Sequence, residues 1–287
     1  MTDKNNILEI EPKLRSKKVK LLAMVAPSFV TDFEYPFFVQ QLYDLGFDKT
    51  TELTFGAKMI NRDYHKKLKK SKNLVIASPC PGIVTTIKNR YPQHVKKLIK
   101  VDSPMVAMAK VCRKHFPNHK IVFISPCDFK KVEANACPQV DYVIDYDQLR
   151  ELFKKYKIKK RKCEVLFNRF YNDYTKIYPL SGGLGKTAQV KKILKEEEIA
   201  ILDGIKNVMG FLDNPDSKVK FFDCLFCNGG CIGGPHTTKK LTIAQKKKKI
   251  LNYLKEAKQE DIPEDRKGII KKAKGLKFKG KVWFNTK

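Results

Sequence analysis

The stretch VKFFDCLFCNGGCIGGP, residues 219–235, determines how this chain can be interpreted. It begins with an apolar, aromatic run typical of a buried β-strand and ends in closely spaced cysteines and glycines. Thiolates bind soft metals, and glycine lets the main chain approach inorganic sulfide closely and donate N–H groups to it. The stretch therefore predicts a strand that leads into a metal-cluster site. Its three cysteines, Cys224, Cys227 and Cys231, cannot fill a four-ligand site, so further ligands must come from elsewhere.

Other apolar runs end in a similar turn, in which a small residue and a proline precede a serine or a cysteine. The runs are 18–27, 74–77 and 121–124, and their turns are Ala26-Pro27-Ser28, Ser78-Pro79-Cys80 and Ser125-Pro126-Cys127. Short, continuous apolar runs are typical of buried strands in parallel sheets, and ligands bind at the carboxyl ends of such strands. We therefore expect Ser28, Cys80 and Cys127 to meet Cys227 and Cys231 at one edge.

Four of these cysteines, Cys80, Cys127, Cys227 and Cys231, would provide the thiolates that a cubane 4Fe-4S cluster needs. Helices are expected to follow Cys80 and Cys127, with Asp128 as the cap of the second. The N-termini of these helices would favour an anionic cluster.

Two less specific interpretations stay open for the same cysteines. They could be core thiols, although each stands in a turn rich in proline or glycine. Alternatively, Cys224-x-x-Cys227 could bind zinc, although no second cysteine pair accompanies it.

The remaining cysteines are given other roles. Cys224 is expected to be a packing residue, and Cys112, Cys137 and Cys163 are expected to be structural. His236, which follows the cysteine-rich loop, is expected to be structural or an outer donor. The segment 183–187 (GLGKT) lacks the first glycine of a phosphate-binding loop, so nucleotide binding is rejected.

The composition limits the partners and the location. The formal net charge is +29, with lysine clusters in 66–72, 154–162 and 246–249. This excess fits an acidic electron-carrier protein or simply a solvated lysine surface, whereas nucleic acid is not expected because base-stacking aromatics do not alternate with the lysines. No apolar run is long enough to span a membrane, and residues 1–18 lack an apolar signal core. Together with eight cysteines, this predicts a reducing, cytoplasmic location.

At its cysteine motifs the sequence resembles the catalytic H-cluster domain of the FeFe-hydrogenases. Three signatures of that family occur here in the same order, and smaller similarities extend the resemblance over about 18–245. The signatures are Ser78-Pro79-Cys80-Pro81-Gly82, then P-C-x-x-K-K-x-E at 126–133, then C-x-G-G-C followed by glycines at 227–234.

The resemblance implies a 4Fe-4S cubane bound by Cys80, Cys127, Cys227 and Cys231. Cys231 matches the ligand that also bridges to a two-iron subcluster with CO and cyanide ligands. Lys130 and Ser28 match donors to the two cyanides, and the implied reaction interconverts hydrogen with protons and electrons. A ferredoxin-like acidic protein is the implied electron partner.

The sequence also departs from the family pattern. Pro79 stands where the fast enzymes have a proton-transferring cysteine, and 53–60 has no carboxylate where the family's outer proton path has glutamates. Ser125 and Leu225 replace methionines, and no ferredoxin-like cysteine set precedes the matched region. These losses resemble the sensory or divergent branch of the family, and they predict slow turnover.

The resulting hypothesis is an α/β, hydrogenase-like redox protein of two lobes, with mainly parallel sheets flanked by helices and the cluster in the cleft between the lobes. The expected division is a flexible tail (1–17), the H-cluster domain (18–260) with a lobe boundary near 100–120, and a basic C-terminal extension (261–287). A further strand is expected over 163–167 and two helical segments over 190–212. A non-catalytic sensor that binds the H-cluster or only the cubane is the alternative, and a plain 4Fe-4S electron carrier or assembly protein is weaker because it has no need of Lys130.

Overall fold

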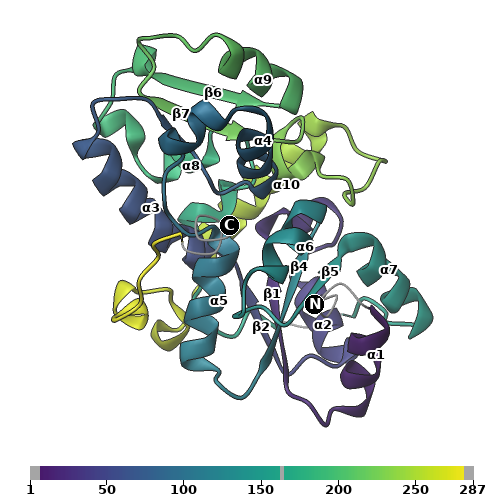
Figure 1. Cartoon of the computed structure of the whole chain (residues 1–287). Coiled ribbons are helices and arrows are strands. Elements are labelled where there is room, and N and C mark those ends of the chain that lie inside the picture. The colour runs from purple at the N-terminus through teal and green to yellow at the C-terminus, as the bar shows by residue number, and fades with distance from the viewer. Residues whose placement is uncertain (1–6, 162–164, 281–287) are drawn as a thin grey trace.

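The first sheet has four parallel strands in the order β2-β1-β4-β5 (Figure 1). Its strands are β1 (Leu21–Val25), β2 (Lys49–Glu52), β4 (Lys120–Ser125) and β5 (Tyr142–Asp145). Alternate residues of β1 enter different cores, because Leu22 and Met24 pack with helices on one face and Leu21 and Val25 pack on the other. Burial on both faces explains why β1 and β4 are continuous apolar runs.

The second sheet has three parallel strands in the order β3-β7-β6. Its strands are β3 (Val75–Ile76), β6 (Ile199–Asp203) and β7 (Phe221–Leu225). The central strand β7 is fully buried and lies within the cysteine-containing stretch 219–235. The edge strand β6 lies inside 190–212, where the sequence predicts only helices. It is only partly buried, so it lacks the apolar run that identifies the other strands.

Helices surround both sheets in the computed structural model, which describes residues 7–161 and 165–280. The α-helices are α1 (Ile7–Ser16), α2 (Phe37–Leu45), α3 (Thr54–Lys70), α4 (Pro81–Arg90), α5 (Pro104–His115), α6 (Asp128–Asn135), α7 (Tyr146–Lys155), α8 (Gly183–Thr187), α9 (Ile205–Asp213) and α10 (Ile243–Gln259). The 3₁₀-helices are η1 (Pro27–Thr31), η2 (Pro92–Lys97), η3 (Tyr174–Ile177), η4 (Val190–Lys192), η5 (Glu196–Glu198), η6 (Gly230–Gly233), η7 (Glu264–Arg266) and η8 (Ile270–Ala273). Helices α3 and α5 share a core with one face of the first sheet, whereas α1, α2 and α7 share a core with its other face. No helix in the described part of the chain combines the length and the apolar character that crossing a membrane requires.

The two sheets alternate along the chain, so one boundary does not separate them. Strand β3 of the second sheet lies between β2 and β4 of the first, and β6 and β7 follow much later. The predicted boundary near 100–120 is therefore wrong. A single boundary would require each sheet to come from one continuous stretch of sequence. Parallel strands are joined by long crossover connections, and these allow the chain to leave one sheet and return to it later.

The N-terminal residues that were expected to form a flexible tail fold where they are described. Residues 7–16 form α1, and its Ile10 and Leu14 are each only 1% exposed. The apolar residues have helical spacing, which the internal proline of α1 obscures in the sequence. The chain packs so closely here that a Cβ on Gly46, whose φ is +125°, would lie 2.1 Å from the carbonyl oxygen of Leu14. The strand was expected over 163–167; its first two residues, which include Cys163, lie outside the described residues, and 165–167 is not a strand.

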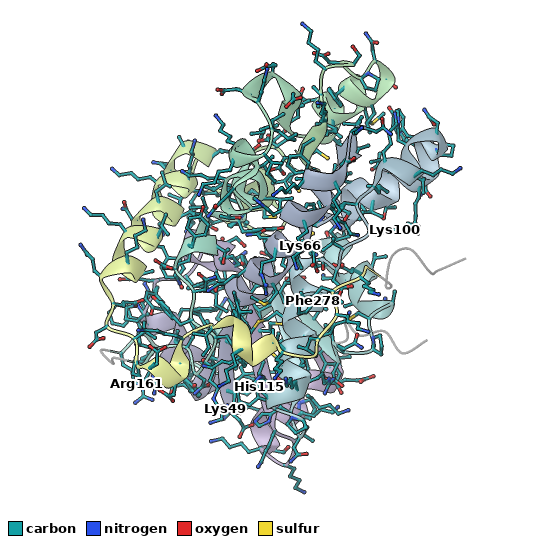
Figure 2. All side chains as sticks on the ribbon, turned by 90° about the vertical axis from the view of Figure 1, so that its left-hand side faces the viewer. Lys49, Lys66, Lys100, His115, Arg161 and Phe278 are labelled. Atoms are coloured by element: carbon teal, nitrogen blue, oxygen red, sulfur yellow. The ribbon has the colours of Figure 1, made fainter. Side chains whose placement is uncertain are left out.

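The C-terminal extension follows the surface of α5 as far as it is described (Figure 2). His115 bonds to the carbonyl oxygen of Lys272 at 2.8 Å, and the carboxylate of Asp102 accepts from the backbone N–H of Gly280 at 2.9 Å. Phe278 of this extension is buried. Residues 261–280 are thus attached to the same domain through backbone groups.

Candidate metal centre

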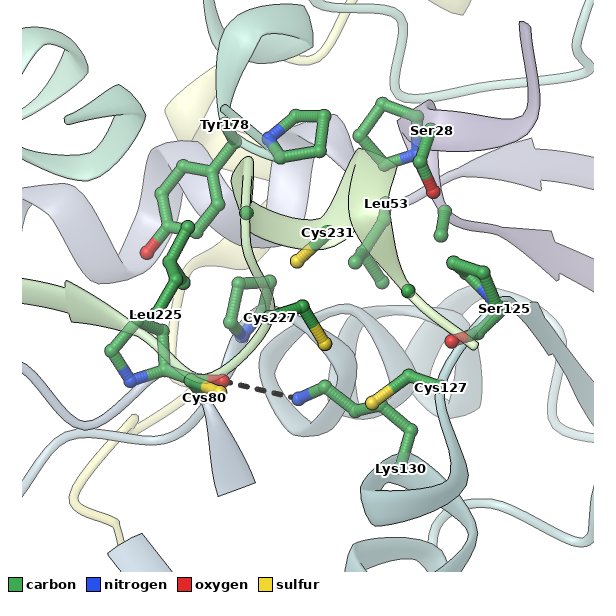
Figure 3. Close-up of a pocket in the computed structure, with 18 of the residues that line it drawn as sticks. Ser28, Leu53, Cys80, Ser125, Cys127, Lys130, Tyr178, Leu225, Cys227 and Cys231 are labelled. Atoms are coloured by element: carbon green, nitrogen blue, oxygen red, sulfur yellow. Dashed lines mark hydrogen bonds between the residues drawn. The ribbon is translucent and has the colours of Figure 1, made fainter. Parts of the chain in front are cut away.

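One pocket collects the four cysteines that the sequence predicts as ligands. Cys80 and Cys127 directly precede α4 and α6, Cys227 follows β7, and Cys231 lies in η6. Figure 3 shows their sulfur atoms in the same pocket, with Lys130 beside them. Residues that follow the carboxyl ends of strands in both sheets therefore line the pocket. Cys80 and Cys231 meet there although 151 positions separate them in the sequence.

Cys80 and Cys127 both bring their thiols to the pocket from the start of a helix. Each is the N-cap residue with an extended conformation, at φ −93° and ψ 111° for Cys80 and φ −132° and ψ 118° for Cys127. Neither side chain caps its helix. The thiols are thus available to the pocket, and the N-termini of α4 and α6 lie next to them, which favours an anionic group. The prediction that Asp128 caps α6 is wrong, because Asp128 is the first residue of that helix.

Glycines return the chain to the pocket between Cys227 and Cys231. Gly229 and Gly230 have φ values of +78° and +76°, in the left-handed region that other residues rarely adopt. A Cβ on Gly230 would lie 2.6 Å from the carbonyl oxygen of Pro179. That same carbonyl accepts the N–H of Cys231 at 2.8 Å. The motif C-x-G-G-C thus fixes where Cys231 enters the pocket.

Burial keeps the thiols of Cys127, Cys227 and Cys231 protonated at neutral pH when no metal is bound. It raises the pKa of Cys127 to about 12 and that of Cys227 to about 11, and the thiol of Cys80 contributes to both shifts. The pKa of Cys231 is raised well above its usual value by burial and by the neighbouring thiols. The charge of Lys130 opposes the shifts at Cys127 and Cys231 because it favours the thiolates. Metal binding must therefore displace these protons.

The spacing of the sulfurs fits a cluster better than a single ion. Within residues 7–161 and 165–280, no three of the cysteine sulfur atoms all lie within 4.8 Å of one another. Zinc with Zn–S bonds of about 2.3 Å would draw its sulfurs to roughly 3.8 Å apart. An iron–sulfur cluster holds its thiolates on separate iron atoms, so its ligands are spread more widely. The four thiols in one buried pocket are a donor set that fits such a cluster.

Cys224 is separate from this set. It is fully buried in β7, it packs in the core of the second sheet, and it does not line the pocket. The Cys224-x-x-Cys227 spacing therefore does not place both sulfurs in one pocket. Cys112 and Cys137 are also fully buried core residues, as expected from the sequence.

Lys130 brings a nearly buried ammonium group to the pocket. Its Nζ donates to the carbonyl oxygen of Pro79 at 3.2 Å and to the carboxylate of Glu133 at 2.6 Å. The side chain of Lys130 is 12% exposed and that of Glu133 is 0% exposed. The carboxylate therefore compensates the buried charge and orients it beside the thiols.

Ser28 also lines the pocket, and it is not a helix cap. Ala26 is the N-cap residue of η1, and the Oγ of Ser28 forms a 2.8 Å hydrogen bond with the hydroxyl group of Tyr146. Burial raises the pKa of Tyr146 well above its usual value, so its hydroxyl stays protonated. The hydroxyl of Ser28 is therefore oriented by a residue that is 118 positions away in the sequence.

The network around His236 is a feature that the sequence does not predict. The Nδ1 of His236 lies 2.6 Å from a carboxylate oxygen of Asp147, and its Nε2 lies 2.7 Å from one of Asp128. The segment that follows Cys231 is thereby linked to the segment that begins at Cys127. These partners are separated by 89 and 108 positions, so local sequence patterns could not reveal them.

Comparison with known proteins identifies similar sequences. A family model described as "Iron only hydrogenase large subunit, C-terminal domain" matches residues 19–235. Iron hydrogenase 1 of Clostridium pasteurianum is 25% identical over 299 aligned positions, which cover 83% of this chain and 51% of that protein. The chain thus spans about half the length of this relative.

Solved structures show the same fold at lower sequence identity. A variant of the [FeFe]-hydrogenase HydA1 from Chlamydomonas reinhardtii has a TM-score of 0.66 and 15% identity, over 92% of this chain and 90% of that one. A HydA(deltaEFG) structure described for stepwise H-cluster assembly gives a TM-score of 0.65 with the same identity and coverage. The arrangement of the two sheets and their helices is therefore shared with these structures.

Proposed function

Because this chain belongs to the family defined by the C-terminal domain of the iron-only hydrogenase large subunit, we propose that it is a redox protein that holds an H-cluster and slowly interconverts hydrogen with two protons and two electrons. The observation that carries this proposal is the pocket that is lined by Cys80, Cys127, Cys227 and Cys231 together with Lys130. A plain cubane would account for the four thiols but not for a buried ammonium group beside them.

Each lining residue has a proposed role. Cys80, Cys127, Cys227 and Cys231 would hold a 4Fe-4S cubane, and Cys231 would also bridge to the two-iron subcluster with CO and cyanide ligands. Lys130, oriented by Glu133, would donate a hydrogen bond to one cyanide. Ser28 would donate to the other, with its hydroxyl oriented by Tyr146. When bound, the cofactor supplies the redox electrons and the site at which the H–H bond is formed or broken.

The slow rate follows from the walls of the pocket. Pro79 lines the pocket and cannot titrate, and no carboxylate lines it in the described part of the chain. A positioned acid–base group typically contributes about 10²- to 10⁴-fold to a rate. We therefore expect turnover to be lower by a factor in this range than in an enzyme with a thiol at this position.

An acidic electron carrier such as a ferredoxin is the proposed partner. A surface groove lined by Cys127 and Cys227 also contains the aromatic side chains of Phe129 and Phe226 and one charge of each sign, Asp128 and Lys206. The groove offers a short path to the cluster thiols, and Lys206 is the cation in it that an acidic carrier would contact. Changing Lys206 to glutamate should slow reduction by an acidic carrier without changing reduction by a small viologen dye, and equal effects on both would contradict this docking site.

The experiment that tests the function is infrared spectroscopy of the protein matured anaerobically with H-cluster maturation proteins. Metal-bound CO and cyanide absorb where the protein does not, so their bands should appear and should shift under hydrogen. Hydrogen evolution with reduced viologen then measures the rate. Matured protein without these bands would refute the proposal.

A sensor is the second candidate, and Pro79 is the observation that favours it. A sensor would bind the same cofactor and respond spectroscopically to hydrogen but would show no turnover. Hydrogen evolution at the rate of the fast enzymes would eliminate this alternative.

A further inference from the structure

A groove lies on the surface between α3 and the C-terminal extension, where Figure 2 labels Lys66, Lys100 and Phe278. Its volume is about 780 Å³, and residues of 59–67 and 270–279 line it together with Lys100. It shares no residue with the metal pocket or with the groove at Lys206. Eight of its lining residues are basic and one, Asp63, is acidic, whereas the whole chain has 59 basic and 30 acidic residues. Positive charge is therefore concentrated in this groove.

Helix α3 forms one wall of the groove with three cations. Arg62 and Lys66 are one helical turn apart and project from the same face, and Lys67 follows them. Burial lowers the pKa of Lys67, the charge of Asp63 opposes this shift, and the charge of Lys100 adds to it. The ammonium groups of Lys67 and Lys100 therefore repel each other, and a single carboxylate does not balance the cations of this wall.

The C-terminal extension forms the other wall, and α5 holds it through main-chain groups. The Nζ of Lys110 donates to the carbonyl oxygen of Lys277 at 3.0 Å. The Nζ of Lys114 donates to the carbonyl oxygen of Lys274 at 2.6 Å. The side chains of Lys274 and Lys277 take no part in these bonds, and both residues are exposed. The wall is therefore fixed in place while its own ammonium groups face solvent.

The cations of both walls lack acidic partners. Within residues 7–161 and 165–280, no ion pair joins any of the eight basic residues of the groove to a carboxylate. Cations that line one hollow raise the local positive potential, and an anionic ligand lowers the repulsion between them. The groove therefore favours a ligand that carries several negative charges.

Apolar side chains indicate which kind of anion fits. Met59, Ile270 and Leu276 line the groove among the cations, and Ile270 is 47% exposed. The one aromatic residue in the described lining, Phe278, is buried, so no base-stacking surface accompanies the charges. A phosphodiester backbone would leave Ile270 uncovered, whereas a polypeptide can supply both carboxylates and apolar side chains.

We propose that the groove between α3 and the C-terminal extension binds a segment of a partner polypeptide that contains both acidic and apolar side chains. Its carboxylates would pair with Lys66 from one wall and Lys274 from the other, and an apolar side chain would cover Ile270. From Met59 to Lys67 the helix rises about 12 Å, so an extended segment of about four residues spans this wall. Binding in the groove is independent of the proposed function, because no residue of the groove lines the metal pocket.

Fluorescence anisotropy with the cluster-free protein tests the location. The probe is a labelled peptide of Glu-Glu-Leu repeats. Lys66→Glu/Lys274→Glu reverses one charge in each wall and should weaken binding about tenfold or more. Lys247→Glu/Lys248→Glu on α10 is the matched control, because both lysines are exposed, lie outside the groove and change the net charge by the same amount. It should change the affinity by less than about twofold. Equal weakening by both variants would mean that net charge alone attracts the peptide and would overturn the proposal.

The variants should fold, because each replaced side chain is exposed and forms no ion pair in the described part of the chain. Urea unfolding checks this. If charge reversal destabilises the protein, Lys66→Gln/Lys274→Gln and Lys247→Gln/Lys248→Gln make the same comparison. The groove variant alone should then weaken binding about threefold, and an unchanged affinity would overturn the proposal.

Two further ligands test the chemistry of the partner. A peptide of Glu-Glu-Ser repeats has the same charge as the first peptide and should bind more weakly, because it cannot cover the apolar side chains. Equal binding of the two peptides would overturn the assignment to a segment with apolar side chains. Poly(U) RNA should respond alike to the groove variant and to the α10 control. RNA binding that only the groove variant weakens would assign the groove to nucleic acid and overturn the proposal.

Carbodiimide crosslinking of the bound peptide locates the contact, because the reagent joins a carboxylate to an amine that touches it. Mass spectrometry should find the Glu-Glu-Leu peptide attached to lysines of the groove, such as Lys66 or Lys274. Crosslinks confined to Lys206 or to the lysines of α10 would place the peptide elsewhere and overturn the proposal.

Discussion

Changing His236 to glutamine should destabilise the protein at pH values below about 6.5 and have little effect at high pH. Both ring nitrogens of His236 face carboxylate oxygens, at 2.6 Å from Asp147 and 2.7 Å from Asp128. Carboxylates only accept hydrogen bonds, so both nitrogens must carry hydrogen and the ring is cationic. Partial burial lowers the pKa of His236, but the bonds to Asp128 and Asp147 outweigh it and raise the pKa above its usual value.

The sign of the pH dependence follows from this shift. A histidine whose pKa is higher in the folded protein contributes its full stability below its unfolded pKa of about 6.5 and loses it as the pH rises through the folded pKa. The two carboxylates stay ionised in this range, because burial raises their pKa values but the bonds to His236 outweigh it and lower them below the usual range. Lys131 bonds to Asp145 at 2.6 Å, and Arg150 bonds to Asp147, so the neighbouring charges are largely paired.

The magnitude is modest because the network is partly exposed. The side chain of His236 is 20% exposed, and those of Asp128 and Asp147 are 57% and 53% exposed. Exposed ion pairs contribute about 0.2–1 kcal/mol each, so the two pairs together should contribute about 1 kcal/mol.

Urea unfolding of the cluster-free protein at pH 5.5 and pH 9 measures this effect. His236→Gln should lower the free energy of unfolding by about 1 kcal/mol at the lower pH and by much less at the higher pH. His65→Gln is the control, because a ring nitrogen of His65 bonds to the carbonyl of Ala188 at 3.0 Å and not to a carboxylate. A loss of stability at His236 that does not depend on pH, or that grows with pH, would refute the cationic network.

Three further substitutions test other parts of the account. Leu14→Ala should lower the free energy of unfolding by about 2–4 kcal/mol, because Leu14 is buried, whereas Leu8→Ala, at a position that is 73% exposed, should change it little. Equal effects of the two substitutions in urea unfolding would mean that α1 does not belong to the core. Pro79→Cys places a titratable thiol in the pocket wall and should raise hydrogen evolution by the matured protein about 10²-fold or more, and an unchanged rate would mean that proton supply does not limit turnover. Lys130→Met leaves the buried carboxylate of Glu133 without its ammonium partner and should lower the free energy of unfolding of the cluster-free protein by about 3 kcal/mol. Adding Glu133→Gln to this variant should restore most of the loss. A double variant that is no more stable than Lys130→Met would contradict the buried pair.

The sequence predicts which cysteines meet in one pocket better than it predicts the boundaries of the fold. Cys80 and Cys127 could be placed in one pocket because each follows a buried parallel strand and precedes a helix, a local pattern with a fixed spatial consequence. Strand β6 and helix α1 were missed because their burial depends on distant partners. Strand β6, for instance, is a half-buried edge strand, and its apolar residues also suit a helix.

Contacts between distant polar groups were the least predictable feature. The chain separates Lys176 from Glu52 by 124 positions and His236 from Asp128 by 108, and no periodicity links such residues. A lysine at position 176 looks like any other surface lysine in a chain with 59 basic residues. Only the folded structure shows that its ammonium group is fully buried.

The central claim is that Cys80, Cys127, Cys227 and Cys231 together hold an iron–sulfur cubane. Its most direct test is the amount of iron and sulfide bound per chain after anaerobic reconstitution, in the unmodified protein and in Cys127→Ser and Cys224→Ser. We predict about four iron and four sulfide ions in the unmodified protein and in Cys224→Ser, and a clear loss in Cys127→Ser. Stoichiometric zinc in place of iron, or a complete cluster in Cys127→Ser, would contradict the claim.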